Sequence, residues 1–206
     1  MTLELGDHVW YWNGQVSQNT DIPRETWFPG CDPNDRTDYL GNGKDIYHFV
    51  VHAGELARGR PHMRGYEGSY AWLNNNPGNI TGSPGGPDYG QYPGKFSWHN
   101  FLVFPTWGAG YAAIAALLHS STYAGLTLAE AFAKYAPASD GNKPQEYARD
   151  VAAAAGVAET VTVDQLDDAQ MVLVQDKITE IEGVIAGDSF ASDSSELPPP
   201  VAALLS

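Results

Sequence analysis

Two glutamates lie close together in the first half of the chain, and paired carboxyl groups are what cleaves glycosidic bonds in many enzymes. Glu55 falls near the end of a segment, residues 46–58, whose apolar residues recur at helical spacing, and Glu67 follows in a loop. A carboxyl group half-buried beside aromatic side chains has its pKa raised by desolvation, which suits a general acid that protonates a glycosidic oxygen. The alternative is that both glutamates are ordinary solvated acids.

Two histidines share the segment that carries Glu55. His48, His52 and Glu55 are spaced i, i+4 and i+7, which places all three on one face of the predicted helix. Histidines four residues apart are the core of helical zinc sites, but the metalloprotease pattern has a glutamate directly after the first histidine, where this chain has Phe49. We therefore expect no metal here, and a polar stripe beside a cleft is the simpler interpretation.

An asparagine-rich turn comes next, where residues 74–80 read Asn-Asn-Asn-Pro-Gly-Asn-Ile. Asparagine tolerates a left-handed backbone, and we expect Gly78 to adopt a positive φ. Asparagine amides bond sugar hydroxyls and N-acetyl carbonyls, so with the nearby aromatic residues this segment predicts a carbohydrate groove. A structured turn over a small aromatic core is an alternative that is compatible with it. The expected substrate-binding residues are Tyr70, Trp72, Asn76, Asn79, Trp98 and Trp107.

The predicted elements that position these residues come in the order helix, small β-region, helices. After the helix over 46–58, the sequence predicts an irregular hairpin over 79–104 and four further helices. The first begins at Pro105, and the second runs from Thr127 to Pro137. The last two cover about residues 144–155 and 167–182, and Gly183 closes the final one. The order indicates an α+β fold that is mostly helical.

The two ends of the chain read differently from its middle. Residues 1–45 form a loop-rich extension with one predicted strand at 8–12, followed by an Asn13-Gly14 turn. Residues 188–206 are acidic and proline-rich, which predicts a flexible tail. We therefore expect one folded domain over residues 46–187, with an extension on either side.

Composition and charge exclude several classes of protein. The chain has 206 residues, enough to bury a core without disulfides, and its single cysteine, Cys31, rules out a thiolate zinc site. Its net charge of −14 opposes binding to nucleic acid and to anionic membrane surfaces. No apolar run reaches the roughly 18 residues that a membrane helix needs, and the N-terminus has no secretory-signal pattern.

Four blocks of this sequence, in one order, resemble a known family. Residues 68–80 are similar to the signature GS-x-A-x-x-NNNPGNI of a lysozyme-like family, whose members occur in bacteriophage tail-associated muralytic proteins and in type VI secretion effectors. Residues 101–111 resemble its F-x-V-F-P-T-x-x-x-G block, residues 125–137 its GLTTIAEI…WAP block, and residues 147–157 its Y…VA…GV block. The resemblance covers roughly residues 46–183.

The resemblance implies a lysozyme-like fold that acts on the glycan strands of peptidoglycan. In such families a helix ending in A-x-A-E-G carries a glutamate and precedes the asparagine motif. Glu55 is the nearest match on the expected helix, so it is the expected general acid. Glu67, which Gly68 follows, is the expected second carboxylate or the competing acid.

The function that follows is that of a muramidase, which cleaves the β-1,4 bond between N-acetylmuramic acid and N-acetylglucosamine without a cofactor. Three alternatives stay open: a lytic transglycosylase acting on the same bond, a non-catalytic peptidoglycan-binding module, and a metal-dependent hydrolase using His48 and His52. We expect a monomeric antibacterial effector domain with peptidoglycan and a cognate immunity protein as partners. We expect it to be exported without a signal peptide, as part of a larger protein, and to act in the target-cell periplasm or cell wall.

Overall fold

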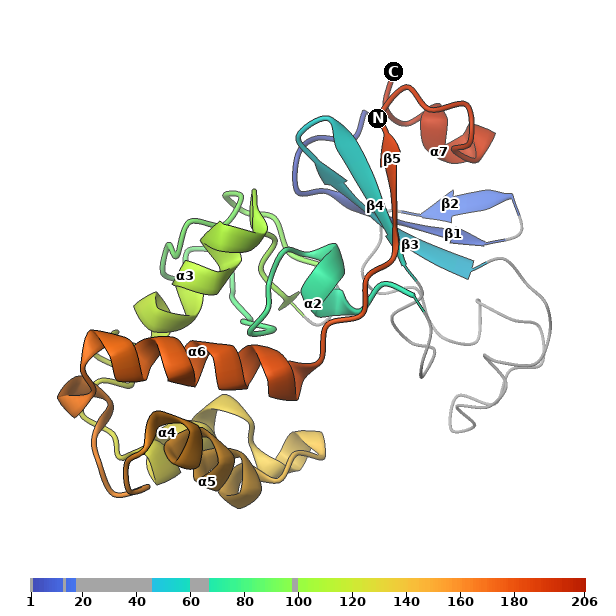
Figure 1. Cartoon of the computed structure of the whole chain (residues 1–206). Helices are drawn as coiled ribbons and strands as arrows, with labels where there is room; N and C mark the ends of the chain where they lie inside the picture. Colours follow the sequence, from blue (N-terminus) through green and yellow to red (C-terminus); the bar gives the residue numbers. More distant parts are fainter. Residues whose placement is uncertain (1, 13, 18–45, 60–66, 98–99) are drawn as a thin grey trace.

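Both ends of the chain build one antiparallel sheet, and the middle of the chain forms a helical part inserted into it (Figure 1). The computed structural model describes residues 2–12, 14–17, 46–59, 67–97 and 100–206. The chain leaves the sheet after Gly59 and returns to it at Asp188. The α+β class expected from the sequence is confirmed.

The sheet has five described strands in the order β2-β1-β3-β4-β5, and all neighbouring strands are antiparallel. Side chains of β3 alternate between the two faces of the sheet. Phe49 and Val51 face a core that also contains Leu197, whereas Val50 packs against Leu73 of the helical part. The strands are β1 (His8–Trp12), β2 (Gln15–Ser17), β3 (Ile46–His52), β4 (Glu55–Gly59) and β5 (Asp188–Ala191).

The helix expected over residues 46–58 is wrong, because this segment is the hairpin of β3 and β4. Gly54, at φ 83°, lies in its turn, and His52 pairs with Glu55 across that turn. The error has a physical cause. Phe49, Val50 and Val51 are all buried, and a strand buried on both faces gives a continuous apolar run that also satisfies helical spacing.

The flexible tail expected over residues 188–206 is also wrong. Strand β5 pairs with β4 at one edge of the sheet, and the chain then turns back as α7 (Pro199–Ala202). Leu197 and Val201 are buried in the core beneath the sheet. Apolar side chains spaced along this acidic, proline-rich segment therefore give it a fixed place in the fold.

The N-terminal segment belongs to the same sheet. The strand predicted at residues 8–12 is confirmed as β1, and β2 follows the glycine turn at Gly14. The Leu3 amide donates a hydrogen bond to the Leu204 carbonyl (2.7 Å), which joins the two ends of the chain. Residues 18–45 of the expected extension lie outside the described part.

The four helices expected after residue 104 are confirmed. In Figure 1, α6 crosses the helical part with α3 on one side and α4 and α5 on the other. Between α2 and α3, bridges from Thr81 to Phe101 and from Phe96 to Leu102 form the irregular hairpin expected over 79–104. The helices are α2 (Tyr70–Leu73), α3 (Trp107–Leu118), α4 (Leu128–Tyr135), α5 (Pro144–Ala155) and α6 (Asp168–Glu182).

Three glycines pack together where the chain passes between the sheet and the helical part. A Cβ atom on Gly59 would lie 2.5 Å from the Gly68 carbonyl oxygen, and one on Gly187 would lie 2.2 Å from a backbone oxygen of β4. Beside them, the Ser69 amide donates to the Ile185 carbonyl (2.9 Å), and the Ile185 amide donates to Ser69 Oγ (3.1 Å). The segment that follows α6 therefore lies directly beside the start of α2.

Candidate active site

The asparagine motif forms a tight loop that Asn76 holds from within. The Asn76 side chain is fully buried. Its Oδ1 accepts from the Ile80 amide (2.9 Å), and its Nδ2 donates to the carbonyls of Ile80 (2.9 Å) and Leu102 (3.0 Å). An amide that has three protein partners and no exposure builds the loop. The expectation that Asn76 contacts substrate does not fit this position.

Gly78 is required by close packing, and the positive φ expected there is wrong. Within this loop the left-handed residues are Asn75 (φ 51°) and Asn79 (φ 46°). A Cβ atom on Gly78 would lie 2.6 Å from Tyr135 Oη and 2.8 Å from Ile114 Cγ1. Asparagine tolerates the left-handed backbone, and at Asn79 this conformation brings the side-chain amide to the end of α6.

Glu182, the last residue of α6, is the carboxylate that this loop reaches. Asn79 Nδ2 donates to its Oε2 (3.0 Å), and the Tyr147 hydroxyl of α5 donates to its Oε1 (2.9 Å). The side chain is half-buried, and burial raises the pKa of Glu182, whereas the two hydrogen bonds favour the charged form and lower it. This carboxyl group therefore keeps its proton to a higher pH than an exposed glutamate does.

Aromatic side chains hold Tyr147 in place beside Glu182. Phe132 stacks on Tyr147 with ring centroids 4.9 Å apart and planes inclined by 16°, and Tyr135 lies 6.0 Å from Tyr147. Burial raises the pKa of both tyrosines. Their hydroxyl groups consequently stay protonated and remain available as hydrogen-bond donors.

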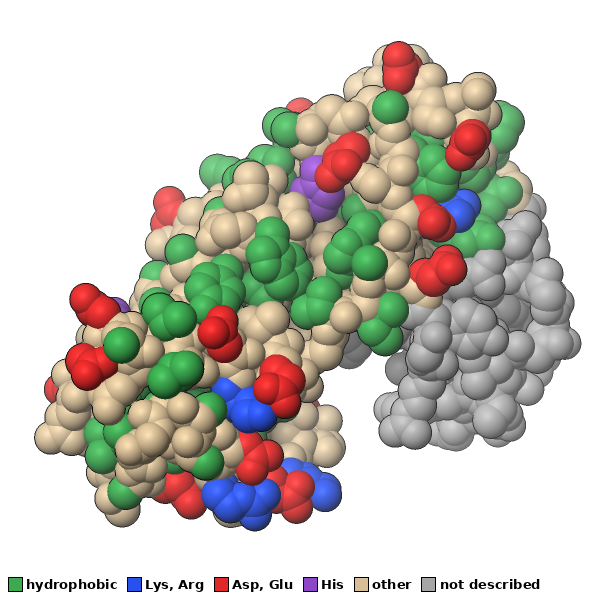
Figure 2. All heavy atoms as spheres, in the orientation of Figure 1, with side chains coloured by type: hydrophobic (Ala, Val, Ile, Leu, Met, Phe, Trp, Pro, Cys, Tyr) green, Lys and Arg blue, Asp and Glu red, His purple; other side chains and the backbone are tan. Residues whose placement is uncertain are grey.

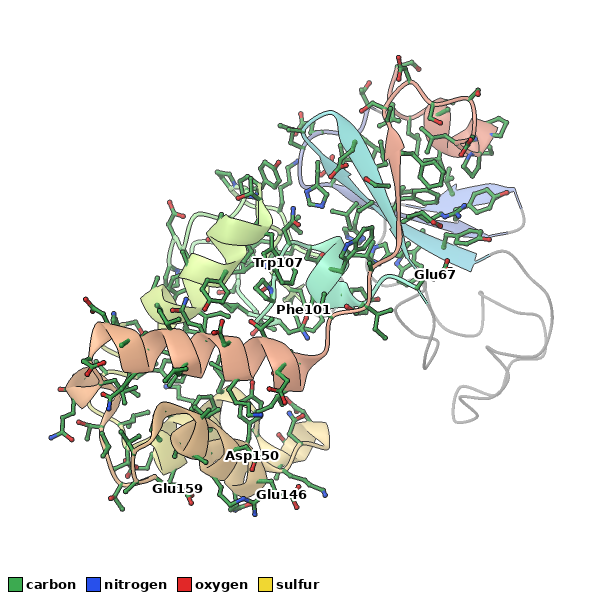
Figure 3. All side chains as sticks on the ribbon, in the orientation of Figure 1. Glu67, Phe101, Trp107, Glu146, Asp150 and Glu159 are labelled. Carbon is green, nitrogen blue, oxygen red and sulfur yellow. The ribbon has the colours of Figure 1, made fainter. Side chains whose placement is uncertain are left out.

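Two cavities meet at Glu182. The larger has a volume of about 780 Å³ and the smaller about 490 Å³, and Asn142 and Glu182 line both of them. Figure 3 shows Phe101, which lines the larger cavity, on one side of the C-terminal end of α6, and Glu146 and Asp150, which line the smaller one, on the other. The Glu182 side chain can thus be reached from either of the two cavities.

Of the other described carboxylates that line these two cavities, Asp140 and Glu146 are exposed and Asp150 is half-buried, and two of the three are paired with bases. Glu146 lies 3.1 Å from the Lys143 ammonium group, and Asp150 lies 3.2 Å from the Arg149 guanidinium group. On the face shown in Figure 2, most of the basic side chains gather at the end that holds α4 and α5, among acidic ones. Exposed pairs of this kind contribute little to stability and are screened by salt. Glu182 differs from them because its carboxyl group is held by two uncharged donors.

A carboxyl group in this setting is suited to acid–base chemistry. Its raised pKa keeps a proton available for transfer, and the cavities give a substrate access to it. After the proton has left, the donors from Asn79 and Tyr147 stabilise the carboxylate that remains. The geometry therefore supports a general acid that can be protonated again from the cavity side.

Neither of the two glutamates expected to be catalytic lines these cavities. Glu55 is exposed on β4, where its Oε2 accepts a hydrogen bond from Ser189 Oγ (2.5 Å). Glu67 is exposed just before α2, and Figure 3 shows it on the sheet side of the molecule, away from α5 and α6. The expectation that Glu55 is the general acid depends on a helix over residues 46–58, and that segment is the hairpin of β3 and β4.

The histidines expected on a helical face lie instead on one face of strand β3, where both are buried. His48 Nε2 lies 2.8 Å from His8 Nδ1, and His52 Nε2 lies 2.8 Å from the Leu73 carbonyl oxygen. Burial lowers the pKa of His52, and it lowers the pKa of His8 to about 4. Within the described part of the chain, no three histidine, cysteine, aspartate or glutamate side chains are grouped to hold a metal ion.

Most of the aromatic residues expected to bind substrate have other positions. Tyr70 and Trp72 lie on α2 and pack against the core between the sheet and the asparagine loop. Trp107 begins α3 and is exposed, and Trp98 lies outside the described residues. Tyr70, Trp72 and Trp107 line neither cavity. The larger cavity is lined by aromatic residues that were not expected there, namely Phe101, Tyr123 and Tyr135.

Sequence reasoning missed Glu182 because its partner in the asparagine motif is far away along the chain. Asn79 and Glu182 are separated by 103 positions. One local signal was present: Glu182 and Gly183 end the predicted helix over residues 167–182, and a glutamate–glycine pair at a helix end is the feature that the resembled family places before its asparagine motif.

No helix in the described ranges is long and apolar enough to cross a membrane. No protein-family model, curated protein or solved structure matches this chain significantly. The functional assignment therefore depends on the geometry around Glu182 and on the sequence blocks themselves.

Proposed function

We propose that this protein cleaves the β-1,4 bond between N-acetylmuramic acid and N-acetylglucosamine in peptidoglycan, with Glu182 as the general acid. The observation that carries this proposal is the hydrogen bond between Asn79 and the half-buried carboxyl group of Glu182 (3.0 Å). It connects the motif that resembles a muralytic family to a carboxyl group suited to protonating a glycosidic oxygen.

The position of Glu182 in the fold also supports the resemblance, although its position along the sequence differs from the family pattern. In the family pattern the glutamate–glycine pair precedes the asparagine motif, whereas Glu182 and Gly183 follow it along this chain. The hydrogen bonds between Ile185 and Ser69 nevertheless place the end of α6 beside the start of α2, which leads into the asparagine loop. The acid-bearing helix and the motif are thus neighbours in space, in an order that the sequence alone does not reveal.

The proposed reaction uses one carboxyl group in two protonation states. Protonated Glu182 donates its proton to the glycosidic oxygen while the bond from that oxygen to the sugar C1 breaks. Asn79 and Tyr147 then hold the resulting carboxylate through the same two hydrogen bonds. The carboxylate takes a proton from the attacking water as that water bonds to C1, which restores the acid and leaves a reducing sugar.

A lytic transglycosylase acting on the same bond is a second candidate function. The carboxylates that line the two cavities support it. Of the other described carboxylates that line them, Asp140 and Glu146 are exposed, and Glu146 and Asp150 are each paired with a base, whereas Glu182 is held by two uncharged donors. Among the described lining residues no second carboxylate is held as Glu182 is, so the proposed attacking group is either water or the 6-hydroxyl of the muramic acid itself. The second route gives an anhydro sugar that is lighter by one water molecule.

Digestion of purified peptidoglycan, followed by mass spectrometry of the soluble products, tests this proposal. We expect disaccharide–peptide fragments that end in reducing or anhydro-muramic acid, from the parent protein and in the presence of a chelator. Fragments cut at amide bonds would contradict the proposal, as would loss of all products with chelator. Binding without any soluble product would identify a non-catalytic peptidoglycan-binding module instead.

A further inference from the structure

The carboxyl group of Glu182 is held at both oxygens by donors from two different parts of the fold. Asn79 comes from the asparagine loop and contacts Oε2, and Tyr147 comes from α5 and contacts Oε1. A carboxylate offers about four lone-pair positions, and these donors occupy two of them. The two contacts therefore fix the plane of the carboxyl group and leave the remaining positions for a proton and a substrate.

We propose that Asn79 and Tyr147 are positioning residues that orient the Glu182 carboxyl group and determine its acidity. The part of this inference that concerns reaction rates rests on the proposed function. The part that concerns the carboxyl group itself does not, because its protonation can be observed without any substrate.

Asn79 is fixed by its backbone as well as by its hydrogen bond to Glu182. Its φ of 46° is held within a loop in which the Asn79 amide donates to the Asn76 carbonyl (2.9 Å). The Asn79 Oδ1 atom is buried and has no hydrogen-bond partner. An amide rotated by 180° exchanges Nδ2 for Oδ1, so one side chain can donate to the carboxylate form of Glu182 and accept from its acid form.

Tyr147 is equally constrained. Its ring stacks on Phe132, and burial raises the pKa of Tyr147, which keeps the hydroxyl protonated in the pH range where Glu182 titrates. A phenol group can also accept a hydrogen bond. Both positioning residues can therefore form hydrogen bonds with Glu182 before and after it transfers a proton, without a change in the backbone.

Other ionisable groups surround Glu182, but the two donors are in direct contact with it. Exposed charges near the cavities act through solvent and are weakened by salt. Lys134 and Tyr135 come from α4, Tyr123 and Asp140 from the connecting loops, and Lys143, Glu146 and Asp150 from the start and middle of α5. Direct hydrogen bonds to a charged group are stronger than these interactions and are not removed by salt.

Three variants remove or reverse the donors. Tyr147→Phe removes the hydroxyl at Oε1, Asn79→Ala removes the amide at Oε2, and Asn79→Asp replaces a donor with a second carboxylate of the same shape. Hydrogen bonds to the charged carboxylate are stronger than those to the neutral acid, so each change disfavours the charged form more and should raise the pKa of Glu182. For each of the first two we expect an upward shift of about one pH unit, a tenfold change in the proton-dissociation constant. The matched control is Tyr135→Phe, because the Tyr135 hydroxyl donates to the Gly78 carbonyl and makes no hydrogen bond to Glu182.

The experiment is a titration of glutamate carboxyl groups by ¹³C NMR, with the Glu182 signal identified as the one missing in Glu182→Gln. The inference predicts upward shifts in Tyr147→Phe, Asn79→Ala and Asn79→Asp, with Tyr135→Phe titrating like the parent. It also predicts that the alkaline limb of the pH–activity profile moves upward in the same variants. Circular dichroism checks that each variant is folded, and Asn79→Asp and Tyr147→Phe decide the question if Asn79→Ala is not.

Two results separate this inference from the proposed function. If the folded donor variants titrate at the parent pH, Asn79 and Tyr147 do not determine the acidity of Glu182, and the inference is overturned. If the shifts occur but the parent releases nothing from peptidoglycan, the proposed function is overturned while the positioning role of the two residues stands.

Discussion

The substitution Asn76→Ala tests whether Asn76 builds the asparagine loop or binds substrate. The amide of Asn76 contacts the backbone of Ile80 on both its amide and carbonyl groups, and it also contacts the Leu102 carbonyl. Alanine removes all three hydrogen bonds at a position with no solvent exposure. The surrounding backbone groups then lose their partner where water has little access.

The loss in free energy of unfolding depends on which of these backbone groups keeps another hydrogen-bond partner. The Ile80 carbonyl still accepts from the Leu102 amide (2.9 Å), whereas the Ile80 amide and the Leu102 carbonyl lose the bond to Asn76. Leaving a buried polar group unsatisfied costs about 1–3 kcal/mol, so the two together should lower the free energy of unfolding by about 2–6 kcal/mol. For a chain of this length that corresponds to a melting temperature lower by about 4–24 °C.

Thermal unfolding followed by circular dichroism measures this loss, with Asn142→Ala as the matched control. Asn142 is exposed in the loop before α5, and it also lines both cavities. Its replacement should change the free energy of unfolding by less than about 0.5 kcal/mol. If Asn76→Ala melts at the same temperature as Asn142→Ala, and only its binding to peptidoglycan is reduced, the structural role argued for Asn76 is wrong.

Three further predictions concern stability. Gly78→Ala should lower the free energy of unfolding by about 1–3 kcal/mol, because its Cβ atom would meet Tyr135 Oη at 2.6 Å. The control Gly125→Ala, which has open space around it, should leave the free energy of unfolding unchanged. Equal urea midpoints for the two variants would refute this. Burial lowers the pKa of His8 to about 4, so the unfolded chain binds a proton that the folded one does not, and the parent should lose roughly 3 kcal/mol as the pH falls from 6.5 to 4. His8→Phe should flatten this dependence in urea unfolding, and an unchanged slope would contradict the argument. Burial raises the pKa of Glu182, so the parent should lose stability as the pH rises through that pKa. Glu182→Gln should therefore be the more stable protein at pH 8, and the difference in free energy of unfolding between the two proteins should shrink toward pH 4. A difference that stays constant with pH would argue against this.

Helices whose signals are local could be predicted from the sequence. Thr127 and Glu130 form the expected capping box at the start of α4, and Gly156 ends α5 in a left-handed conformation (φ 69°). Each of these signals involves residues within one or two turns of each other, so the surrounding fold has little influence on them.

The sheet could not be predicted in the same way, because its partners come from distant parts of the chain. Strand β3 is covered on one face by the core that contains Leu197 and on the other by Leu73 of α2. Burial on both faces removes the alternation of polar and apolar residues by which a strand is recognised. The apolar positions that anchor the C-terminal segment are too widely spaced among prolines and acids to indicate an element by themselves.

The candidate site shows the same limit. The asparagine motif was recognisable, but the carboxyl group that it contacts lies 103 positions away, and the burial that raises the pKa of Glu182 arises only when α4, α5 and α6 pack together. The sequence could identify the kind of residue that the chemistry needs. Only the fold indicates which glutamate has the environment for it.

The most direct test of the central claim compares three glutamine variants with the parent on one preparation of purified peptidoglycan. Glu182→Gln, Glu55→Gln and Glu67→Gln each remove one acid while keeping the size of the side chain. Initial rates of muropeptide release, measured by liquid chromatography and mass spectrometry, should fall by at least about 100-fold for Glu182→Gln, because that is the low end of what a positioned acid contributes. The other two variants should retain rates close to that of the parent. Near-parent turnover by Glu182→Gln, together with loss of activity in Glu55→Gln or Glu67→Gln, would contradict the assignment of Glu182 as the general acid.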